Sequence, residues 1–231
     1  MMNGKPAVVL LSGGIDSATA LALAREDGFA VHAMTFRYGQ RHAIEVEAAQ
    51  RLAHRFDVVR HVIIDLDLRL FGGSALTSEL PVPRHGEARA NAIPVTYVPA
   101  RNTIFLSFAL AWAEVLGAQD IFMGANADDA SGYPDCRPAY LRAFERMADL
   151  ATREGVDGRQ RLRIHAPLCD LSKSETVRLG QRLGVPFELT WSCYNPTAAN
   201  APCRVCDACS IRGQAFEACG LQDPLQPAWS A

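Results

Sequence analysis

The sequence predicts an α/β fold: a doubly wound, mostly parallel sheet with a small C-terminal metal-binding subdomain. Short apolar runs alternate with stretches of helical periodicity along most of the 231 residues. Such alternation implies right-handed crossovers and a sheet that is covered on both faces. The first apolar run ends in a Ser-Gly-Gly turn, and four cysteines lie close together near the end of the chain. We expect the main domain to span residues 1–187 and the subdomain to span 188–231.

The first part of the chain is predicted to be strand, helix, strand, helix, strand. A strand that is buried on both faces needs a continuous apolar run, which Ala7 to Leu11 supplies, and a helix should begin near Ser17. Further along, the pattern predicts a strand at 30–36, a charged amphipathic helix at 41–55 and a strand at 58–65.

The middle of the chain begins with a segment, 66–91, that contains several glycines and prolines and little periodicity, which predicts a long surface excursion. After it we expect a largely buried helix at 102–116 with Asn102 as its N-cap, a strand at 120–124, a helix at 138–153 and a strand at 162–167. Ser172 to Glu175 has the pattern of a capping box, so a helix should begin there and run to about Leu183.

Charge and hydropathy narrow the class of function. Lys and Arg total 23 against 25 for Asp and Glu, so no strong positive field would attract a polyanion, and a nucleic-acid partner is disfavoured. The apolar run near the start of the chain is too short for a signal peptide or a membrane span, so we expect a cytoplasmic protein. Thiols stay reduced in the cytosol, and clustered cysteines there indicate a metal site.

The turn from Ser12 to Ser17 has the character of an anion site. It lies between a buried strand and a helix, where free N–H groups and the positive end of the helix dipole meet. Glycine at 13 and 14 lets the backbone approach phosphate oxygens, the serine hydroxyls add donors, and Asp16 is a candidate for orienting these groups or holding Mg²⁺. The chain lacks the Gly-x-x-x-x-Gly-Lys-[Ser/Thr] motif that grips the β and γ phosphates.

Four of the seven cysteines, Cys193, Cys203, Cys206 and Cys209, have the spacing C-x9-C-x2-C-x2-C. Two-residue gaps place thiolates on a tight turn around one tetrahedral ion, and four sulfurs close its coordination shell. We therefore predict a structural Zn²⁺ without a catalytic role. Four buried free thiols, or an iron–sulfur cluster, are the alternatives.

The SGGIDS loop resembles the PP-loop of ATP pyrophosphatases, whose Rossmann-like members cleave ATP between the α and β phosphates. Read in order, LLSGGIDSATAL, TFRYGQRH, YVPARNTIFLSFALAWAEVLGA, GYPDCRPAY, PLCDLSKSETVRLG, GVPFELTWSCYN and CRVCDAC resemble the 7-cyano-7-deazaguanine synthase family over nearly the whole chain. The loop between Cys193 and Cys203 departs from that pattern, because a more Gly- or Lys-containing segment is usual there.

The resemblance implies a reaction and its components. Its substrates would be 7-carboxy-7-deazaguanine, ammonia and two ATP, and its product 7-cyano-7-deazaguanine on the route to queuosine. Adenylation would activate first the carboxylate and then the resulting amide, so no covalent enzyme nucleophile is needed. Zn²⁺, Mg²⁺ and a homodimer are further expectations, and free ammonium is the expected nitrogen donor.

Residues expected to contact ATP are Leu11, Ser12, Gly13, Gly14, Ile15, Asp16, Ser17, Ala18, Thr19, Ala20 and Leu21. Lys173, in the string that resembles the family's LSKxE motif, is a candidate for neutralising charge on the transferring phosphate. Arg101 is a candidate for holding phosphate or the substrate carboxylate. With Asp16 and Ser17, these two residues form the predicted catalytic set.

The deazaguanine end of the site is expected in the loop after the strand at 120–124, because open α/β sheets bind ligands at the carboxyl ends of their strands. Asp128, Asp129 and Asp135 are candidates for accepting hydrogen bonds from the guanine-like edge, and Tyr133 for stacking on the ring.

Other functions are compatible with the same motifs. A tRNA-modifying PP-loop enzyme shares the phosphate loop but needs an RNA-binding surface, which the near-neutral charge disfavours. A nucleotide-binding module without turnover is a second alternative. The third is a paralogue that passes the activated deazaguanine to another acceptor.

Overall fold

The computed structural model describes residues 4–41, 44–87, 93–127, 132–159 and 161–225. In these segments, parallel strands form one sheet in the order β3–β2–β1–β4–β5. The strands are β1 (Pro6–Leu10), β2 (Ala30–Arg37), β3 (Arg60–Asp65), β4 (Asp120–Phe122) and β5 (Arg163–His165). The predicted α/β fold with a parallel sheet is confirmed.

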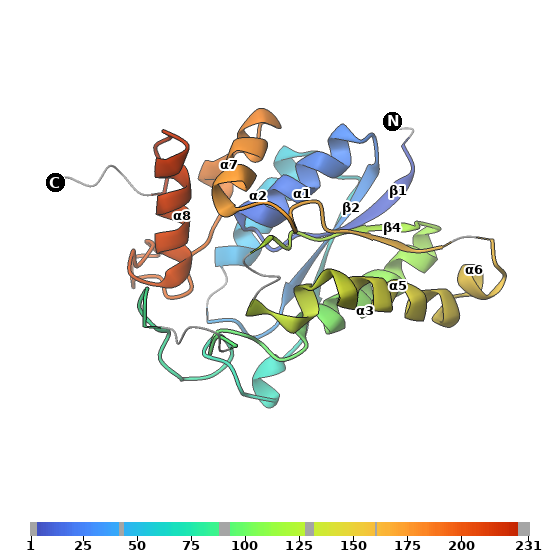
Figure 1. The fold of residues 1–231 in the computed structure, drawn as a ribbon, viewed down its shortest axis with the longest axis horizontal. Helices are drawn as coiled ribbons and strands as arrows, with labels where there is room; N and C mark the ends of the chain where they lie inside the picture. Colours follow the sequence, from blue (N-terminus) through green and yellow to red (C-terminus); the bar gives the residue numbers. More distant parts are fainter. Residues whose placement is uncertain (1–3, 42–43, 88–92, 128–131, 160, 226–231) are drawn as a thin grey trace.

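Helices cover both faces of this sheet. On one face lie α1 (Ile15–Glu26), α2 (Ile44–Arg55) and α7 (Lys173–Arg182), with α8 (Asp207–Ala218) packed beside α7; on the other lie α3 (Arg101–Leu116) and α5 (Pro138–Ala151) (Figure 1). Short helices are η1 (Leu68–Leu70), η2 (Pro134–Cys136), α6 (Arg153–Val156) and η3 (Phe187–Leu189). No helix among the described residues is long and apolar enough to span a membrane.

The position of β1 at the centre of the sheet explains why its sequence is apolar throughout. Ala7 and Val9 pack with Leu21 of α1, whereas Val8 belongs to the cluster that contains Leu106 of α3. Because successive side chains of a strand point to opposite faces, a strand with helices on both sides needs apolar residues throughout. All three β1 residues are fully buried.

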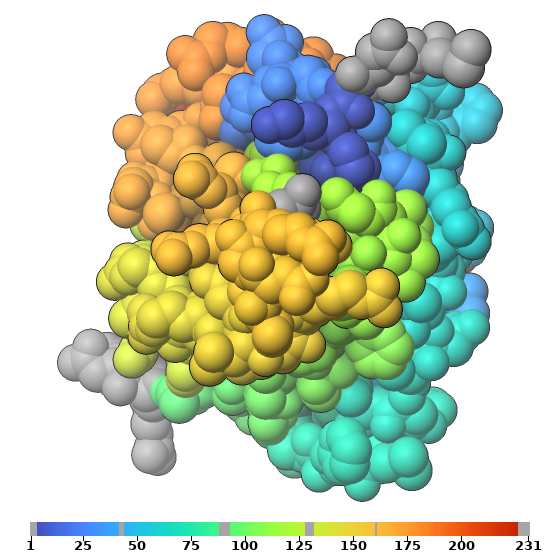
Figure 2. All heavy atoms as spheres, turned by 90° about the vertical axis from the view of Figure 1, so that its right-hand side faces the viewer, coloured from blue at the N-terminus to red at the C-terminus, as the bar shows by residue number. Residues whose placement is uncertain are grey.

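Helices α5 and α6 cover part of the side of the molecule where the chain enters β1 (Figure 2). Seen from that side, α6 and the segment after it cover the centre of the face, with α5 beside them (Figure 2). The long helix predicted at 138–153 ends earlier than expected, at Ala151, because the Thr152 hydroxyl accepts a hydrogen bond from the Gly155 N–H and caps the separate helix α6. The carboxyl ends of the strands face the opposite side.

Two other predictions for the middle of the chain are corrected. Asn102 is not the N-cap of α3: Ala100 holds that position with a left-handed φ of 52°, and Asp135 Oδ2 accepts from the Asn102 N–H at 2.9 Å. The described part of the segment 66–91 is not only a surface excursion, because Ser74 and Ala75 are fully buried. The Arg41 guanidinium fixes it by donating to the carbonyl oxygens of Ala75, Ser78 and Leu80.

Buried hydrogen bonds of Arg212 connect the end of the chain to α8 and α8 to the residues around η3. Arg212 of α8 is 2% exposed and donates from Nε to both carboxylate oxygens of Asp223, at 3.0 and 2.9 Å. Its other nitrogens donate to Thr190 Oγ1 at 2.9 Å and to the Phe187 carbonyl at 3.1 Å. Such a charge is tolerated in the interior only because its hydrogen bonds are satisfied.

The capping box at the start of α7 is present in full. The Ser172 hydroxyl accepts from the Glu175 N–H at 3.3 Å, and the Glu175 carboxylate accepts from the Ser172 N–H at 2.8 Å. Ser172→Ala is expected to lower the free energy of unfolding by about 1 kcal/mol, since one helix N–H loses its partner. Urea unfolding measures this change; Ser210→Ala, within α8, is the control, and an equal loss there would contradict the capping role.

Candidate active site

The phosphate loop, Ser12 to Ser17, is a self-bonded turn between β1 and α1. The Ser17 hydroxyl donates to the Gly14 carbonyl at 3.1 Å and accepts from the Ser12 N–H at 3.1 Å. Two glycines in it have different functions. Gly13 has a φ of 87°, and a Cβ there would lie 2.3 Å from the Glu45 carbonyl oxygen, so it is needed for close packing on α2. Gly14 lines the cavity described below, and a Cβ there would meet nothing closer than 3.5 Å.

Asp16 and Lys173 form an ion pair beside this turn. Lys173 Nζ lies 2.6 Å from Asp16 Oδ2, and both side chains are less than one-fifth exposed. Asn126 Nδ2 donates to the same oxygen at 3.2 Å, while Asp16 Oδ1 is buried without a hydrogen-bond partner among the described residues. The pair brings together two sequence-predicted residues from α1 and α7, which are 157 positions apart.

A cavity of about 280 Å³ opens in front of the phosphate loop. Its wall includes Leu10 at the end of β1, Phe36 at the end of β2 and Met123 just after β4. β1 lies between β2 and β4, where the direction of strand succession reverses. Crevices at such switch points are the usual ligand sites of open α/β sheets. The cavity therefore lies where an open α/β sheet is expected to bind its ligand.

Within this cavity, a cation and aromatic rings lie opposite the phosphate loop. Arg101 Nη1 donates to the Tyr38 hydroxyl at 3.4 Å. Burial lowers the pKa of Arg101, but the phenol oxygens of Tyr38 and other tyrosines oppose this effect and raise it overall, so the guanidinium stays charged. Burial also raises the pKa of Tyr38, which stays a neutral phenol. Phe36 and Phe105 stack with centroids 3.8 Å apart and add a flat apolar wall.

A smaller pocket of about 70 Å³ adjoins the cavity and shares Arg101, Asn102 and Tyr133 with it. Asp135 lines this pocket and is only 5% exposed. Its Oδ2 accepts from the Asn102 N–H, but its Oδ1 is buried with no hydrogen-bond partner among the described residues. Because Asp135 lines this pocket, the oxygen is placed where a ligand donor could supply the missing hydrogen bond. Asp128 and Asp129 lie outside the described residues.

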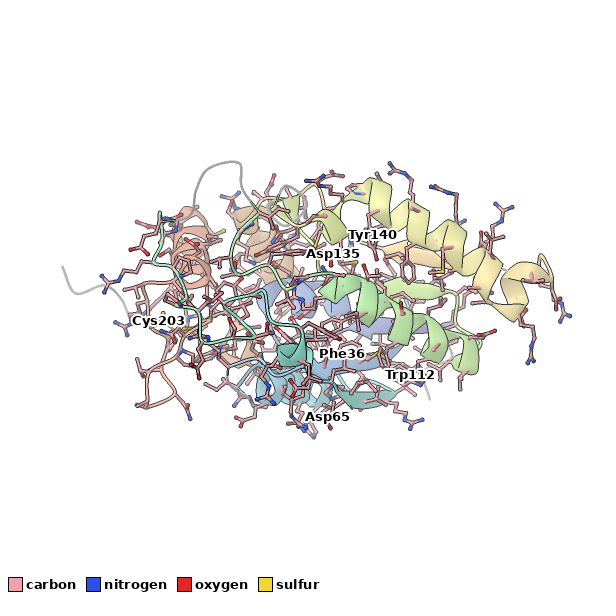
Figure 3. The ribbon with its side chains drawn as sticks, turned by 90° about the horizontal axis from the view of Figure 1, so that it is seen from below. Phe36, Asp65, Trp112, Asp135, Tyr140 and Cys203 are labelled. Atoms are coloured by element: carbon pink, nitrogen blue, oxygen red, sulfur yellow. The ribbon has the colours of Figure 1, made fainter. Side chains whose placement is uncertain are left out.

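Figure 3 shows how these parts are arranged along the molecule. Phe36 and Asp135 both lie near the amino-terminal end of α3, and Cys203 lies at the far end of the molecule, by α8. Tyr133, which was predicted to stack on a substrate ring, lines both pockets and packs against Tyr97 with ring centroids 5.8 Å apart.

The four clustered cysteines meet in space as their spacing predicts. The four Sγ atoms of Cys193, Cys203, Cys206 and Cys209 all lie within 4.8 Å of one another. A tetrahedral zinc ion with bonds of about 2.3 Å would hold its sulfurs about 3.8 Å apart, which this cluster permits with a small contraction. The Cys203 N–H donates to Cys193 Sγ at 3.2 Å, and Arg204 has a φ of 65°, which turns the chain between the ligands. These residues fit a tetrahedral metal.

The cysteine cluster is physically connected to the active site. The Trp191 N–H, two residues before Cys193, donates to the Gly13 carbonyl of the phosphate loop at 2.8 Å. Trp191 also packs against the cysteines and lines the cavity, as does Ala208 of α8. On the other side, the His85 N–H donates to the Val205 carbonyl at 2.8 Å, so the segment after β3 is bound to the same turn.

Some of the site residues predicted from the sequence line the cavity, and others do not. Leu11, Ser12, Gly14, Ile15, Asp16, Ser17, Arg101, Tyr133 and Lys173 line the main cavity, and Asp135 lines the adjoining pocket. Ala18, Thr19, Ala20 and Leu21 are buried and lie outside the cavity wall, because the axis of α1 carries them away from the loop. The Thr19 hydroxyl donates to the Ile15 carbonyl instead.

Several cavity residues were missed from the sequence: Tyr38, Glu45, Leu76, Asn126 and Trp191. Tyr38 is part of the TFRYGQRH string, so the family resemblance could have identified it as a site residue. Glu45 looks like an ordinary acidic residue in the first turn of a helix, and Leu76 lies in a segment without periodicity. Only the fold brings these side chains to one place.

Comparisons with known proteins place the chain in a family. The family model described as queuosine biosynthesis protein QueC matches residues 6–220. A 7-cyano-7-deazaguanine synthase from Geobacter sulfurreducens is 58% identical over 221 residues, which are 96% of this chain and 92% of that protein. The protein of the same name from Paramagnetospirillum magneticum is 58% identical over 224 residues, covering 96% of this chain and 98% of its own length.

A solved structure shares the fold at low sequence identity. NMN synthetase from Francisella tularensis has a TM-score of 0.51 and 20% identity, with 95% of this chain and 79% of that chain covered. The family match is much stronger, because it spans almost the whole chain and includes the phosphate loop and all four clustered cysteines. The chain belongs to the QueC family of queuosine biosynthesis proteins.

Proposed function

We propose that this chain is an ATP-dependent ligase that converts 7-carboxy-7-deazaguanine and ammonia into 7-cyano-7-deazaguanine (preQ0) in queuosine biosynthesis. Two relatives that are 58% identical to this chain are named for that activity. The observation that carries the proposal is the shape of the site. A phosphate loop with the Asp16–Lys173 pair lies at one side of the cavity, and the adjoining pocket holds a buried carboxylate oxygen without a partner.

The chemistry explains why one phosphate loop is enough. A carboxylate is a poor electrophile at neutral pH, and attack of its oxygen on the α-phosphorus of ATP supplies AMP as a leaving group. Ammonia then replaces AMP and gives the amide. A second adenylation, on the amide oxygen, lets AMP leave again as the nitrile forms. In this proposal Lys173 and Arg101 balance the charge that develops on phosphate, and Asp16 orients Lys173.

Two metals belong to the proposal. The four cysteines would hold a structural Zn²⁺, because a shell of four thiolates is closed and leaves no position for substrate. Mg²⁺ would accompany the ATP phosphates, with Asp16, whose Oδ1 has no hydrogen-bond partner among the described residues, as a candidate ligand. The contacts to ATP are proposed for the cavity-lining residues Leu11, Ser12 and Gly14 to Ser17, and not for Gly13, which packs on α2, or for the rest of α1. A division at residue 187, a homodimer, a cytoplasmic location and the absence of a nucleic-acid partner are also proposals.

Asp135 is proposed to recognise the guanine-like edge of the substrate. That edge presents two N–H donors side by side, which a carboxylate accepts well. Asp135→Asn is expected to raise the KM for 7-carboxy-7-deazaguanine by about 10- to 100-fold, as for the loss of a charged hydrogen bond worth about 1.5–3 kcal/mol. Steady-state kinetics with each substrate varied in turn measures this effect. The KM for ATP serves as the internal control, and an equal rise in both values would contradict the assignment.

One incubation tests the proposed function. Purified protein with bound metal is mixed with ATP, Mg²⁺, ammonium and 7-carboxy-7-deazaguanine, and the deazapurine and nucleotides are followed by mass spectrometry. The expected sequence is acid, amide and nitrile, with AMP and pyrophosphate released. ADP with orthophosphate would contradict it. An activated acid that is consumed without nitrile formation would point to another acceptor, and salt-dependent tRNA binding would point to an RNA-modifying enzyme.

A further inference from the structure

Glu45 is a carboxylate in the cavity wall that the steps above do not use. It lies in the first turn of α2, and the absence of a side chain at Gly13 lets the phosphate loop touch the backbone there. Tyr38, Gln40 and Arg101 line the same cavity, and Arg101 is close enough to Glu45 to lower its pKa. The phosphate loop and Arg101, the first residue of α3, line this cavity as well, so in the proposed reaction the activated carbonyl group would form in the cavity whose wall contains Glu45.

The surroundings of Glu45 keep its carboxyl group close to half-ionisation at neutral pH. Burial raises the pKa of Glu45 to about 7, and the Arg101 guanidinium opposes this rise. The pKa of Tyr38 is raised mainly by burial and, to a smaller extent, by this carboxylate, while Arg101 opposes the rise. Other ionisable groups on the described cavity wall are Tyr133, Tyr194, Cys136 and the Asp16–Lys173 pair. A general base is most effective when its pKa lies near the working pH.

The reaction requires a proton acceptor, and the residues assigned so far do not supply one. Lys173 and Arg101 are cations, and Asp16 is paired with Lys173 at 2.6 Å. We propose that the Glu45 carboxylate contacts the incoming ammonia and accepts the protons that leave its nitrogen, an inference that rests on the proposed function. Because a catalytic base must be within reach of its proton, its position in the cavity wall is the first requirement.

The protons can be followed through the two halves of the reaction. Attack of ammonia forms a C–N bond at the acyl adenylate and leaves a positively charged nitrogen. Glu45 takes one proton from it, and the C–O bond to AMP breaks with its electron pair to give the amide. After the second adenylation, the two remaining N–H protons leave in turn, and the C–O bond to AMP breaks as the triple bond forms. Between transfers, Glu45 returns each proton to water.

Hydroxylamine, used as an alternative nucleophile, distinguishes a role of Glu45 as a base from a role in adenylation. At neutral pH ammonia is mostly ammonium, whereas hydroxylamine is mostly unprotonated and its adduct loses a proton readily to water. With Glu45→Gln, amide and nitrile formation from ammonium should fall by about 100-fold or more, the usual scale of a general base. Hydroxamate formation from 7-carboxy-7-deazaguanine, ATP and hydroxylamine should stay close to the wild-type rate, because the acyl adenylate still forms.

Two further variants and a pH profile complete the experiment. Glu47→Gln removes an exposed carboxylate from the same turn of α2 and should leave both rates unchanged. Glu45→Asp keeps a carboxylate and should retain part of the ammonium-dependent rate. In the wild type, kcat at saturating ammonium should fall as the pH is lowered through about 7, where Glu45 becomes protonated, and the hydroxylamine reaction should lack this inflection. Thermal unfolding of Glu45→Gln at pH 8 should occur no lower than in the wild type.

The outcomes are distinct. A Glu45→Gln variant that makes nitrile at nearly the wild-type rate would overturn the role of Glu45. So would a folded variant that loses hydroxamate and nitrile formation to the same extent, because the residue would then act in adenylation or positioning. If the wild type itself formed no hydroxamate and no pyrophosphate, the proposed function would fail, and the role of Glu45 would fail with it.

Discussion

Replacement of Lys173 by alanine is expected to lower the rate of pyrophosphate release by at least about 100-fold, as for the loss of one preorganised donor to a developing anion. Lys173 reaches the phosphate loop from the first position of α7, and the Ser172–Glu175 capping box fixes that end of the helix. Its ammonium group lies 2.6 Å from Asp16 Oδ2 and opens onto the cavity. Alanine keeps the helix but leaves no cation at this position.

Asp16→Asn should have a similar effect, because Lys173 then loses the carboxylate that orients it. Since the two side chains are in direct contact, the double variant should be little slower than either single variant. AMP and pyrophosphate are measured with 7-carboxy-7-deazaguanine present, alongside metal content and thermal unfolding. Arg182→Ala removes an exposed cation from the other end of α7 and should leave the rate unchanged. Near-normal turnover of Lys173→Ala or Asp16→Asn would remove that residue from the catalytic set.

Loss of one clustered cysteine is expected to remove both the metal and the activity. Cys206→Ser should lower the ratio of bound zinc to chain from about one towards zero, because serine is a poor ligand for zinc in a four-thiolate shell. Without the metal, the cysteines would no longer hold Trp191 in place. The hydrogen bond from the Trp191 N–H to the Gly13 carbonyl, 2.8 Å long, would then weaken. Metal analysis, thermal unfolding and pyrophosphate release measure the three consequences.

Cys169→Ser is the matched control for this variant. Cys169 is half-buried, lies outside the cluster, and should keep metal, stability and activity when it is replaced. Removal of the metal from the wild type with a chelator should reproduce the Cys206→Ser result. Added zinc should then restore the activity of the chelated wild type but not that of Cys206→Ser. Full activity of a metal-free Cys206→Ser protein would show that the cluster does not support the phosphate loop.

Much of the fold could be predicted because its signals are local. The fully apolar β1, the Ser-Gly-Gly turn and the capping box each depend on residues within a few positions of one another. The cysteine spacing is also a local signal, since Cys203, Cys206 and Cys209 lie within seven residues, at the entry to α8 and in its first turn. The start of α3 was placed wrongly for the same reason. Asn102 has the side chain of an N-cap, but tertiary contact with Asp135 gives its backbone N–H another partner.

The candidate site was predicted residue by residue but not as an arrangement. Asp16, Arg101, Lys173 and Asp135 were each proposed from their motifs, yet nothing in the sequence pairs Asp16 with Lys173 or leaves one oxygen of Asp135 without a partner. Glu45 was not proposed at all, since an acidic residue in the first turn of a helix is common at a solvated surface. Its environment follows from the packing of α2 on the phosphate loop.

By itself, the sequence determined the family, the parallel α/β fold, the phosphate loop and the metal-ligand spacing, because these depend on short-range patterns of apolar, glycine and cysteine residues. Only the tertiary structure decided which of these parts share a cavity. The order β3–β2–β1–β4–β5 brings the ends of separate strands together, and α7 returns Lys173 to a loop 157 positions earlier. Packing over such separations depends on the whole core, which no local pattern encodes.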